Sequence, residues 1–225
     1  MDRNFHLPCE FPAWRRSAAD ELVNAATHAL GLVLAIVGAL VMADGVLAAG
    51  DAWLSIGCGV YLASLVTVYA MSTLSHCAMP RRWKSLFRRL DQGFIYLLIV
   101  ATYTPFSLAY LRDGWWWLLL AAMWCVALAG FAAKVFFAHR VEVVSVVSYL
   151  VLGWMPMLAV PALLQSIPAG ALWSMLAGGV CYTAGTLFLA FDERVRHFHA
   201  VWHLCVIAGS ACHFLGILVF VVGAH

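Results

Sequence analysis

Long apolar stretches and short polar connections alternate along this chain. Each apolar stretch is close to the roughly 20 residues that an α-helix needs to cross the hydrocarbon core of a membrane. Charged side chains lie almost wholly between the stretches. The pattern predicts an all-α integral membrane protein, a bundle of seven transmembrane helices. The predicted spans are about residues 22–42, 52–75, 93–111, 115–137, 143–163, 171–191 and 200–222.

Composition strengthens this prediction and indicates the domain organisation. Of the 225 residues, 64% are hydrophobic and 11% are charged, whereas charged residues make up about a quarter of a soluble globular domain. No linker interrupts the series of spans. We therefore expect a single domain over residues 1–225, in which residues 1–20 form a cytoplasmic N-terminal segment. Pro105 is expected to kink the third span, and Pro156 and Pro161 the fifth.

The basic residues predict how the bundle is oriented. Cytoplasmic segments of membrane proteins carry an excess of Lys and Arg. With the N-terminus in the cytoplasm, twelve of the thirteen basic residues fall in cytoplasmic segments. We expect a cytoplasmic N-terminus and an external C-terminus, and in a bacterium the protein would lie in the cytoplasmic (inner) membrane. The twelve residues are Arg3, Arg15, Arg16, Arg81, Arg82, Lys84, Arg88, Arg89, Lys134, Arg140, Arg194 and Arg196.

The net charge of +2 does not point to a nucleic-acid partner. The basic segments have an ordinary explanation as topology signals and as contacts with anionic lipids. We expect no nucleic-acid binding, and we expect membrane lipids to be the substrate or ligand.

A pair of histidines at the start of the seventh span is the strongest functional clue. His199 and His203 are four residues apart, so their side chains share one face of a helix. Ionisable groups inside a span are costly and usually mark function. The predicted orientation brings His76, at the end of the second span, and Asp91, at the start of the third, to the same depth as this pair. All four residues are expected near the inner leaflet.

Three imidazoles and an open position filled by water form the ligand set of a catalytic zinc site. His76, His199 and His203 can supply it. Asp91 would then either hold a ligand in place or accept a proton from water, and Ser72 lies one turn before His76 on the same helical face. Simpler explanations remain open, since an HxxxH pair alone is a weak signal. Asp91 can instead mark the membrane edge beside Arg88 and Arg89, and Ser72 can form an interhelical hydrogen bond.

Other polar residues in the spans are expected to support this site or to lie away from it. Glu21, Asn24 and His28 form one stripe at the start of the first span. Glu21 is equally explained as a first-turn helix residue, and no chemistry is assigned to it. His213 lies fourteen residues after His199, roughly 20 Å along the helix axis. It cannot bind the same ion and is expected to form a buried hydrogen bond or to line a polar cavity.

These residues, in this order, resemble the hemolysin III family within the broader progestin and adipoQ receptor group. Three blocks of sequence carry the resemblance, and they touch the first, second, third and seventh spans. The blocks are Glu21-Leu-Val-Asn24-Ala-Ala-Thr27-His28-Ala-Leu-Gly31; Ser72-Thr-Leu-Ser-His76, followed by Leu90-Asp91-Gln92 and Thr102-Tyr103-Thr104-Pro105-Phe106; and His199-Ala-Val-Trp202-His203, followed by His213-Phe214.

The resemblance implies a seven-helix bundle with a cytoplasmic N-terminus, and zinc held by His76, His199 and His203 with a water near Ser72 and Asp91. Alkaline ceramidases, which hydrolyse lipid amides, look distantly similar. The chain departs from the family pattern at three positions that affect only the shape of the pocket. Gln92 stands where His is expected, Ser75 where Tyr is more usual, and Ala101 where Gly is expected.

Three functions follow from this sequence. The first is a zinc-dependent hydrolase that cleaves a lipid amide or ester in the inner leaflet. The second is a non-enzymatic membrane sensor or regulator in which zinc is structural. The third, suggested by the family name, is a cytolytic or channel protein. The long, evenly apolar spans speak against a dedicated toxin, because secreted pore formers need solubility and amphipathic segments.

Overall fold

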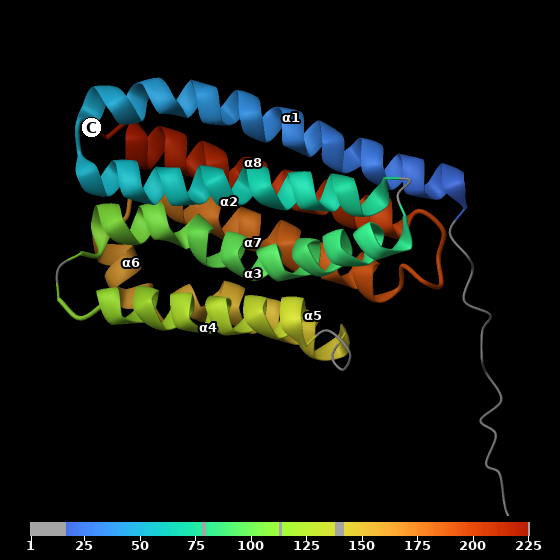
Figure 1. Ribbon diagram of the computed structural model, residues 1–225. Helices are drawn as coiled ribbons and strands as arrows, with labels where there is room; N and C mark the ends of the chain where they lie inside the picture. Colours follow the sequence, from blue (N-terminus) through green and yellow to red (C-terminus); the bar gives the residue numbers. More distant parts are fainter. Residues whose placement is uncertain (1–16, 78–79, 113, 138–141, 225) are drawn as a thin grey trace, which may run out of the picture.

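The computed structural model describes residues 17–77, 80–112, 114–137 and 142–224. Within these ranges seven helices are long and apolar enough to cross a membrane, as the sequence predicts. They lie roughly side by side in one bundle (Figure 1). The elements are α1 (Ala18–Ala49), α2 (Ala52–His76), α3 (Arg81–Tyr110), α4 (Trp117–Phe136), α5 (Glu142–Trp154), a 3₁₀ turn (Met155–Ala159), α6 (Val160–Ser166), α7 (Ala169–Ala190), α8 (Phe198–Ile217) and a π turn (Leu218–Val222).

Local sequence explains where the first helices begin and end. Ser17 caps α1 in a capping box with Asp20, in which each side chain bonds the other residue's backbone N–H. At the other end of α1, Gly50 has φ 64°, a left-handed conformation that favours glycine. Asp51 then accepts a hydrogen bond from the Leu54 amide at 2.8 Å and starts α2. Two residues therefore suffice to reverse the chain.

Proline has different effects in the third and fifth spans. The fifth span is broken into α5, the 3₁₀ turn and α6, with Pro156 and Pro161 in the first turns of the last two pieces. This confirms the predicted kink, because each proline lacks the N–H that would bond to the preceding turn. Pro105 lies inside α3, which is one uninterrupted helix, and the kink expected there stays a prediction.

Helix α3 begins at Arg81, well before the apolar stretch that starts near residue 93. The basic segment expected to connect the second and third spans is therefore largely helical. An apolar window shows where a helix enters the membrane, whereas the helix itself continues as far as its backbone hydrogen bonds do. As a result, Asp91 lies within a helix and not in a loop, and the helix fixes its position relative to α2.

Helix α1 packs along α2 and α8 (Figure 1), and the bundle interior is filled by large side chains such as Tyr61, Tyr69 and Phe106. Gly31 permits the close approach of α1 to α2, since a Cβ there would lie 2.5 Å from Tyr69 Cε1.

The starts of α1 and α8 meet the end of α2 at one end of the bundle, where Glu21 contacts His76. We call this end the basic end. The orientation of the bundle in a membrane stays a prediction.

Candidate metal centre

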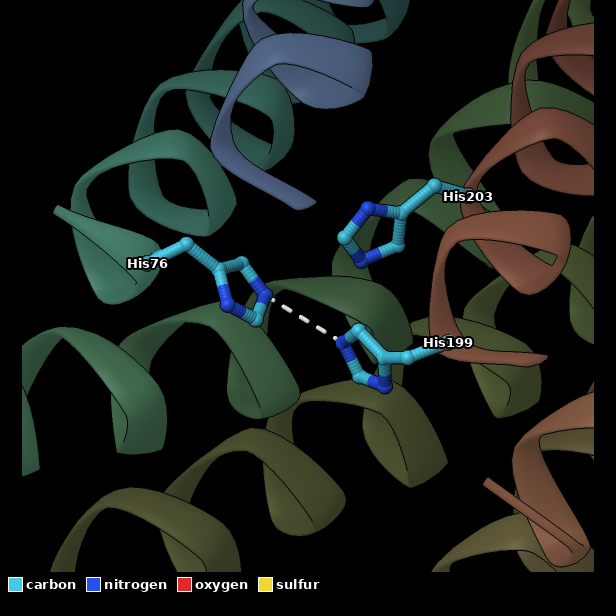
Figure 2. Close-up of side chains that lie close together, drawn as sticks. All are labelled: His76, His199 and His203. Carbon is cyan, nitrogen blue, oxygen red and sulfur yellow. Dashed lines mark hydrogen bonds between the residues drawn. The ribbon is translucent and has the colours of Figure 1, made fainter. Parts of the chain in front are cut away.

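Three histidines converge at the basic end, from the last residue of α2 and the first two turns of α8. One ring nitrogen from each of His76, His199 and His203 lies within 4.8 Å of the other two. His76 and His203 are buried, and His199 is partly buried. Figure 2 shows the three rings turned toward a common centre. The sequence identified all three residues.

Two of the rings each contact a carboxylate through the nitrogen on the side away from the centre. His76 Nδ1 lies 2.8 Å from Glu21 Oε2, and His199 Nδ1 lies 2.6 Å from Asp192 Oδ2. An ionised carboxylate only accepts hydrogen bonds, so each Nδ1 carries the proton. In a neutral imidazole the other nitrogen then presents a lone pair. Both Nε2 atoms therefore face the centre as acceptors.

These two acceptors lie against each other. The Nε2 atoms of His76 and His199 are 3.2 Å apart (Figure 2). Two lone pairs at this distance repel unless a proton or a cation lies between them. In a tetrahedral zinc site with Zn–N bonds of about 2.0–2.1 Å, two nitrogen ligands lie about 3.3 Å apart. The donor set and its spacing therefore fit a bound metal ion.

His203 completes the group and has a different partner. Its Nδ1 lies 2.9 Å from the Thr27 hydroxyl of α1. The rings of His203 and His199 meet edge to face with their centroids 4.5 Å apart, and Figure 2 shows a nitrogen of His203 facing the other two rings. His203 is only 1% exposed, so its ring lies inside the protein.

Asp91 and Ser72 lie on neighbouring helices, close to the end of α2 that carries His76. Ser72 is buried one turn before His76 on α2. Asp91 of α3 contacts the same stretch of α2, with Oδ2 3.5 Å from Ser75 Oγ and with Ser72 as a further hydrogen-bonding neighbour. The structure thus brings Asp91 and Ser72 together. Their catalytic roles stay predictions.

The stripe on α1 faces the centre. Asn24 and His28 are buried, and Glu21 is partly buried. The His28 ring stacks on that of His203, with centroids 3.5 Å apart and planes at 30°, and it meets Tyr69 edge to face. Neither nitrogen of His28 has a hydrogen-bond partner among the residues that the structure describes.

His213 lies ten residues beyond His203 on α8, away from the three converging rings. Its ring stacks on Tyr182 of α7, with centroids 5.6 Å apart. Gly178 makes room for it, since a Cβ there would lie 2.3 Å from His213 Nε2. Within the described part of the chain, Nδ1 of His213 has no hydrogen-bond partner.

Two neighbours of the histidines, Asp192 and Thr27, were not predicted from the sequence. Asp192 lies seven residues before His199 in a series of turns, so no helical spacing relates the two. The chain reverses at His197, whose φ is 67°, and this reversal brings the carboxylate back to the imidazole. Thr27 offered a signal: it lies three residues after Asn24, on nearly the same face of α1.

The chain is similar to known proteins of one family. Residues 16–214 match the family model described as Haemolysin-III related. The chain is 36% identical to Hemolysin-3 of Bacillus cereus over 203 residues, which cover 90% of this chain and 92% of that protein. It is 34% identical to the Hemolysin-3 homolog of Bacillus subtilis (strain 168), covering 90% and 95% of the two chains.

A more distant relative comes from humans. The chain is 26% identical to the human Monocyte to macrophage differentiation factor over 216 residues, covering 91% of this chain and 85% of that protein. No solved structure matches the chain at a comparable level. These matches confirm the resemblance drawn from the three sequence blocks.

Proposed function

The chain belongs to the haemolysin III family, and we propose that it is an integral-membrane, zinc-dependent hydrolase of a lipid amide or ester. One observation carries the proposal. Three imidazoles converge at one end of a transmembrane bundle, with carboxylates behind two of them and a Ser72–Asp91 pair one helical turn away. A purely structural site does not need a carboxylate and a hydroxyl beside its ligands.

His76, His199 and His203 would hold the metal. Bound zinc polarises a carbonyl and lowers the pKa of a bound water to about 7. Three protein ligands leave a fourth position open, as catalytic zinc sites do. A structural site is usually closed by a fourth protein ligand, so the three-histidine set favours chemistry.

Asp91 and Ser72 supply the remaining chemistry. The Asp91 carboxylate accepts the proton of the attacking water, and it later returns this proton to the leaving amine or alcohol. The Ser72 hydroxyl donates a hydrogen bond to the substrate carbonyl oxygen as negative charge develops there. Helices α2 and α3 hold both side chains, so their positions require little rearrangement during the reaction.

A lipid is the natural substrate for a site in this place. The site lies at the end of transmembrane helices, and the predicted orientation puts that end at the inner leaflet. Amide and ester linkages of membrane lipids lie near the boundary between head groups and acyl chains. A lipid entering between helices would therefore bring its carbonyl to the depth of His199 without leaving the membrane.

Lysis is a second candidate, favoured by the name of the Bacillus cereus relative, Hemolysin-3. The packing of the bundle argues against a channel through a single copy. Tyr61, Phe106 and Met123 are fully buried in its interior, where a channel would need polar, hydrated walls. A regulator with structural zinc is the remaining alternative.

The test combines zinc content with hydrolysis of a panel of lipid amides and esters by the purified full-length protein. His203→Ala removes a ligand, and Asp91→Asn removes the base but keeps the side-chain size. We expect His203→Ala to lose zinc and activity, and Asp91→Asn to keep zinc and to lose activity by roughly 10²–10⁴-fold.

Matched controls are available on the same elements. His213→Ala removes a histidine from α8 far from the centre, and Asp44→Asn changes an exposed carboxylate at the far end of α1. Both should keep zinc and activity. Stoichiometric zinc without turnover of any lipid would contradict the hydrolase and favour the regulator. Ion conductance of pure protein in planar bilayers would favour the pore.

A further inference from the structure

We propose that helix α1, which supplies no metal ligand, determines how tightly the metal is held, with Thr27 as the positioning residue for His203. This inference rests on the metal site of the proposed function. It concerns which nitrogen of His203 faces the metal and what keeps it there.

The neighbours of the Thr27 hydroxyl determine whether it donates a hydrogen bond to His203 or accepts one from it. The hydroxyl has one proton, and two backbone acceptors of its own helix lie within reach: Asn24 O at 2.9 Å and Val23 O at 3.1 Å. A hydroxyl that donates to a backbone carbonyl can only accept from a third group. Thr27 Oγ1 therefore accepts from His203 Nδ1–H across 2.9 Å.

This contact fixes the tautomer of the third ligand. With the proton on Nδ1, the lone pair of a neutral His203 is on Nε2, the nitrogen that ligates in the proposed site. The Asn24 backbone carbonyl is a further acceptor beside the same ring. The stacked His28 ring, also from α1, restricts rotation of His203 about its side-chain bonds.

Helix α1 holds a second ligand in the same way. Glu21 Oε2 accepts from His76 Nδ1, while Glu21 Oε1 lies 3.3 Å from Lys84 Nζ at the start of α3. Lys84 thus limits the orientations open to the carboxylate. Two of the three ligands depend on α1, and the remaining one depends on Asp192.

The start of α1 is itself fixed to the segment that precedes α8. Asp20 is 3% exposed and accepts from Arg196 Nε at 3.0 Å, and His197 Nδ1 lies 3.7 Å from the same oxygen. These contacts join Ser17–Glu21 to the turn that carries Asp192. Positions on α1 and α8 are thereby set relative to each other before a metal binds.

The experiment uses full-length protein in detergent micelles, stripped with a chelator and titrated with Co²⁺, followed by Zn²⁺ competition. Thr27→Val keeps the shape and removes the acceptor. We expect zinc affinity to fall about 10-fold, the low end of the usual effect of such partners, and the visible Co²⁺ spectrum to change. Thr27→Ser should restore both.

Thr67→Val is the matched control. Thr67 of α2 also bonds the carbonyl of its own helix, Ala63 O at 2.7 Å, and its substitution should leave metal binding unchanged. Equal melting temperatures of the metal-free variants would show that Thr27→Val folds.

The outcomes separate this inference from the proposed function. If Thr27→Val binds both ions as wild type does, with the same Co²⁺ spectrum, the positioning role is wrong and the metal site stands. If wild type binds neither ion, both are overturned. Wild type could instead bind zinc without hydrolysing any lipid, while Thr27→Val binds zinc weakly. The proposed hydrolase function would then be wrong, and the positioning role of Thr27 would be supported.

Discussion

The Nε2 atoms of His76 and His199 face each other across 3.2 Å, and each ring is bonded through Nδ1 to a carboxylate. His76 is on α2 and His199 is on α8, and the two residues are 123 positions apart in the chain. Two acceptors fixed at this distance repel each other, and a bound cation removes this repulsion and stabilises the folded protein. Stability and metal binding are therefore expected to be coupled.

Removing metal should destabilise the protein. A ligand present at 1,000 times its Kd stabilises the folded state by about 4 kcal/mol. We expect a chelator to lower the melting temperature of wild type by several degrees and added Zn²⁺ to restore it. His203→Ala should respond to neither. A melting temperature that is insensitive to chelator and zinc in wild type would contradict a tightly bound metal.

Asp192 should be needed for metal affinity although it is not a ligand. Asp192→Ala removes the carboxylate that lies 2.6 Å from His199 Nδ1 and that helps to orient the ring. We expect zinc affinity to fall about 10–100-fold, measured by competition with a chelator. Glu193→Gln, at the neighbouring exposed position, is the control and should bind as wild type. Equal affinities for the two variants would show that Asp192 is dispensable.

Two glycines should respond oppositely to the same substitution. A Cβ at Gly31 would lie 2.5 Å from the Tyr69 ring, so Gly31→Ala must displace the ring or α1. We expect a loss of about 1–3 kcal/mol in the free energy of unfolding. Gly59, within α2, has nothing within 4 Å of its Cβ position. Gly59→Ala should therefore leave thermal stability unchanged or raise it slightly.

Ser210 should stabilise the middle of the bundle. Its hydroxyl bonds Tyr69 Oη at 2.9 Å and Tyr182 Oη at 3.0 Å, joining α2, α7 and α8. Ser210→Ala removes this partner from the buried Tyr69 and the partly buried Tyr182, and we expect a cost of about 1–3 kcal/mol in thermal or chemical unfolding. Zinc affinity should change little. Full stability of Ser210→Ala would mean that the tyrosines find other partners.

The orientation of the bundle is open to a direct test. The distribution of basic residues predicts a cytoplasmic N-terminus and an external C-terminus. A reporter enzyme that is active only outside the cytoplasm should work when fused after His225 and not when fused before Met1. The reverse result would place the three histidines at the outer leaflet and would exclude an inner-leaflet lipid as the substrate.

The sequence by itself determined the helices and the three histidines that converge. Seven apolar stretches of membrane-spanning length predict seven helices, because in a membrane each backbone polar group must be satisfied within its own helix. The shared face of His199 and His203 follows from their i, i+4 spacing on one helix. The alternating direction of the spans puts His76 at the same depth. These are local or one-dimensional properties, and a single chain displays them directly.

Only the tertiary structure decided which groups hydrogen-bond to those histidines. Asp192 reaches His199 because the intervening turns reverse the chain at His197. Thr27 reaches His203 because α1 packs beside α8, close enough for a 2.9 Å hydrogen bond. Glu21, which the sequence explained as an ordinary first-turn residue, bonds His76 for the same reason. Helical spacing relates residues within one helix, whereas these contacts depend on how separate helices and a turn pack against one another.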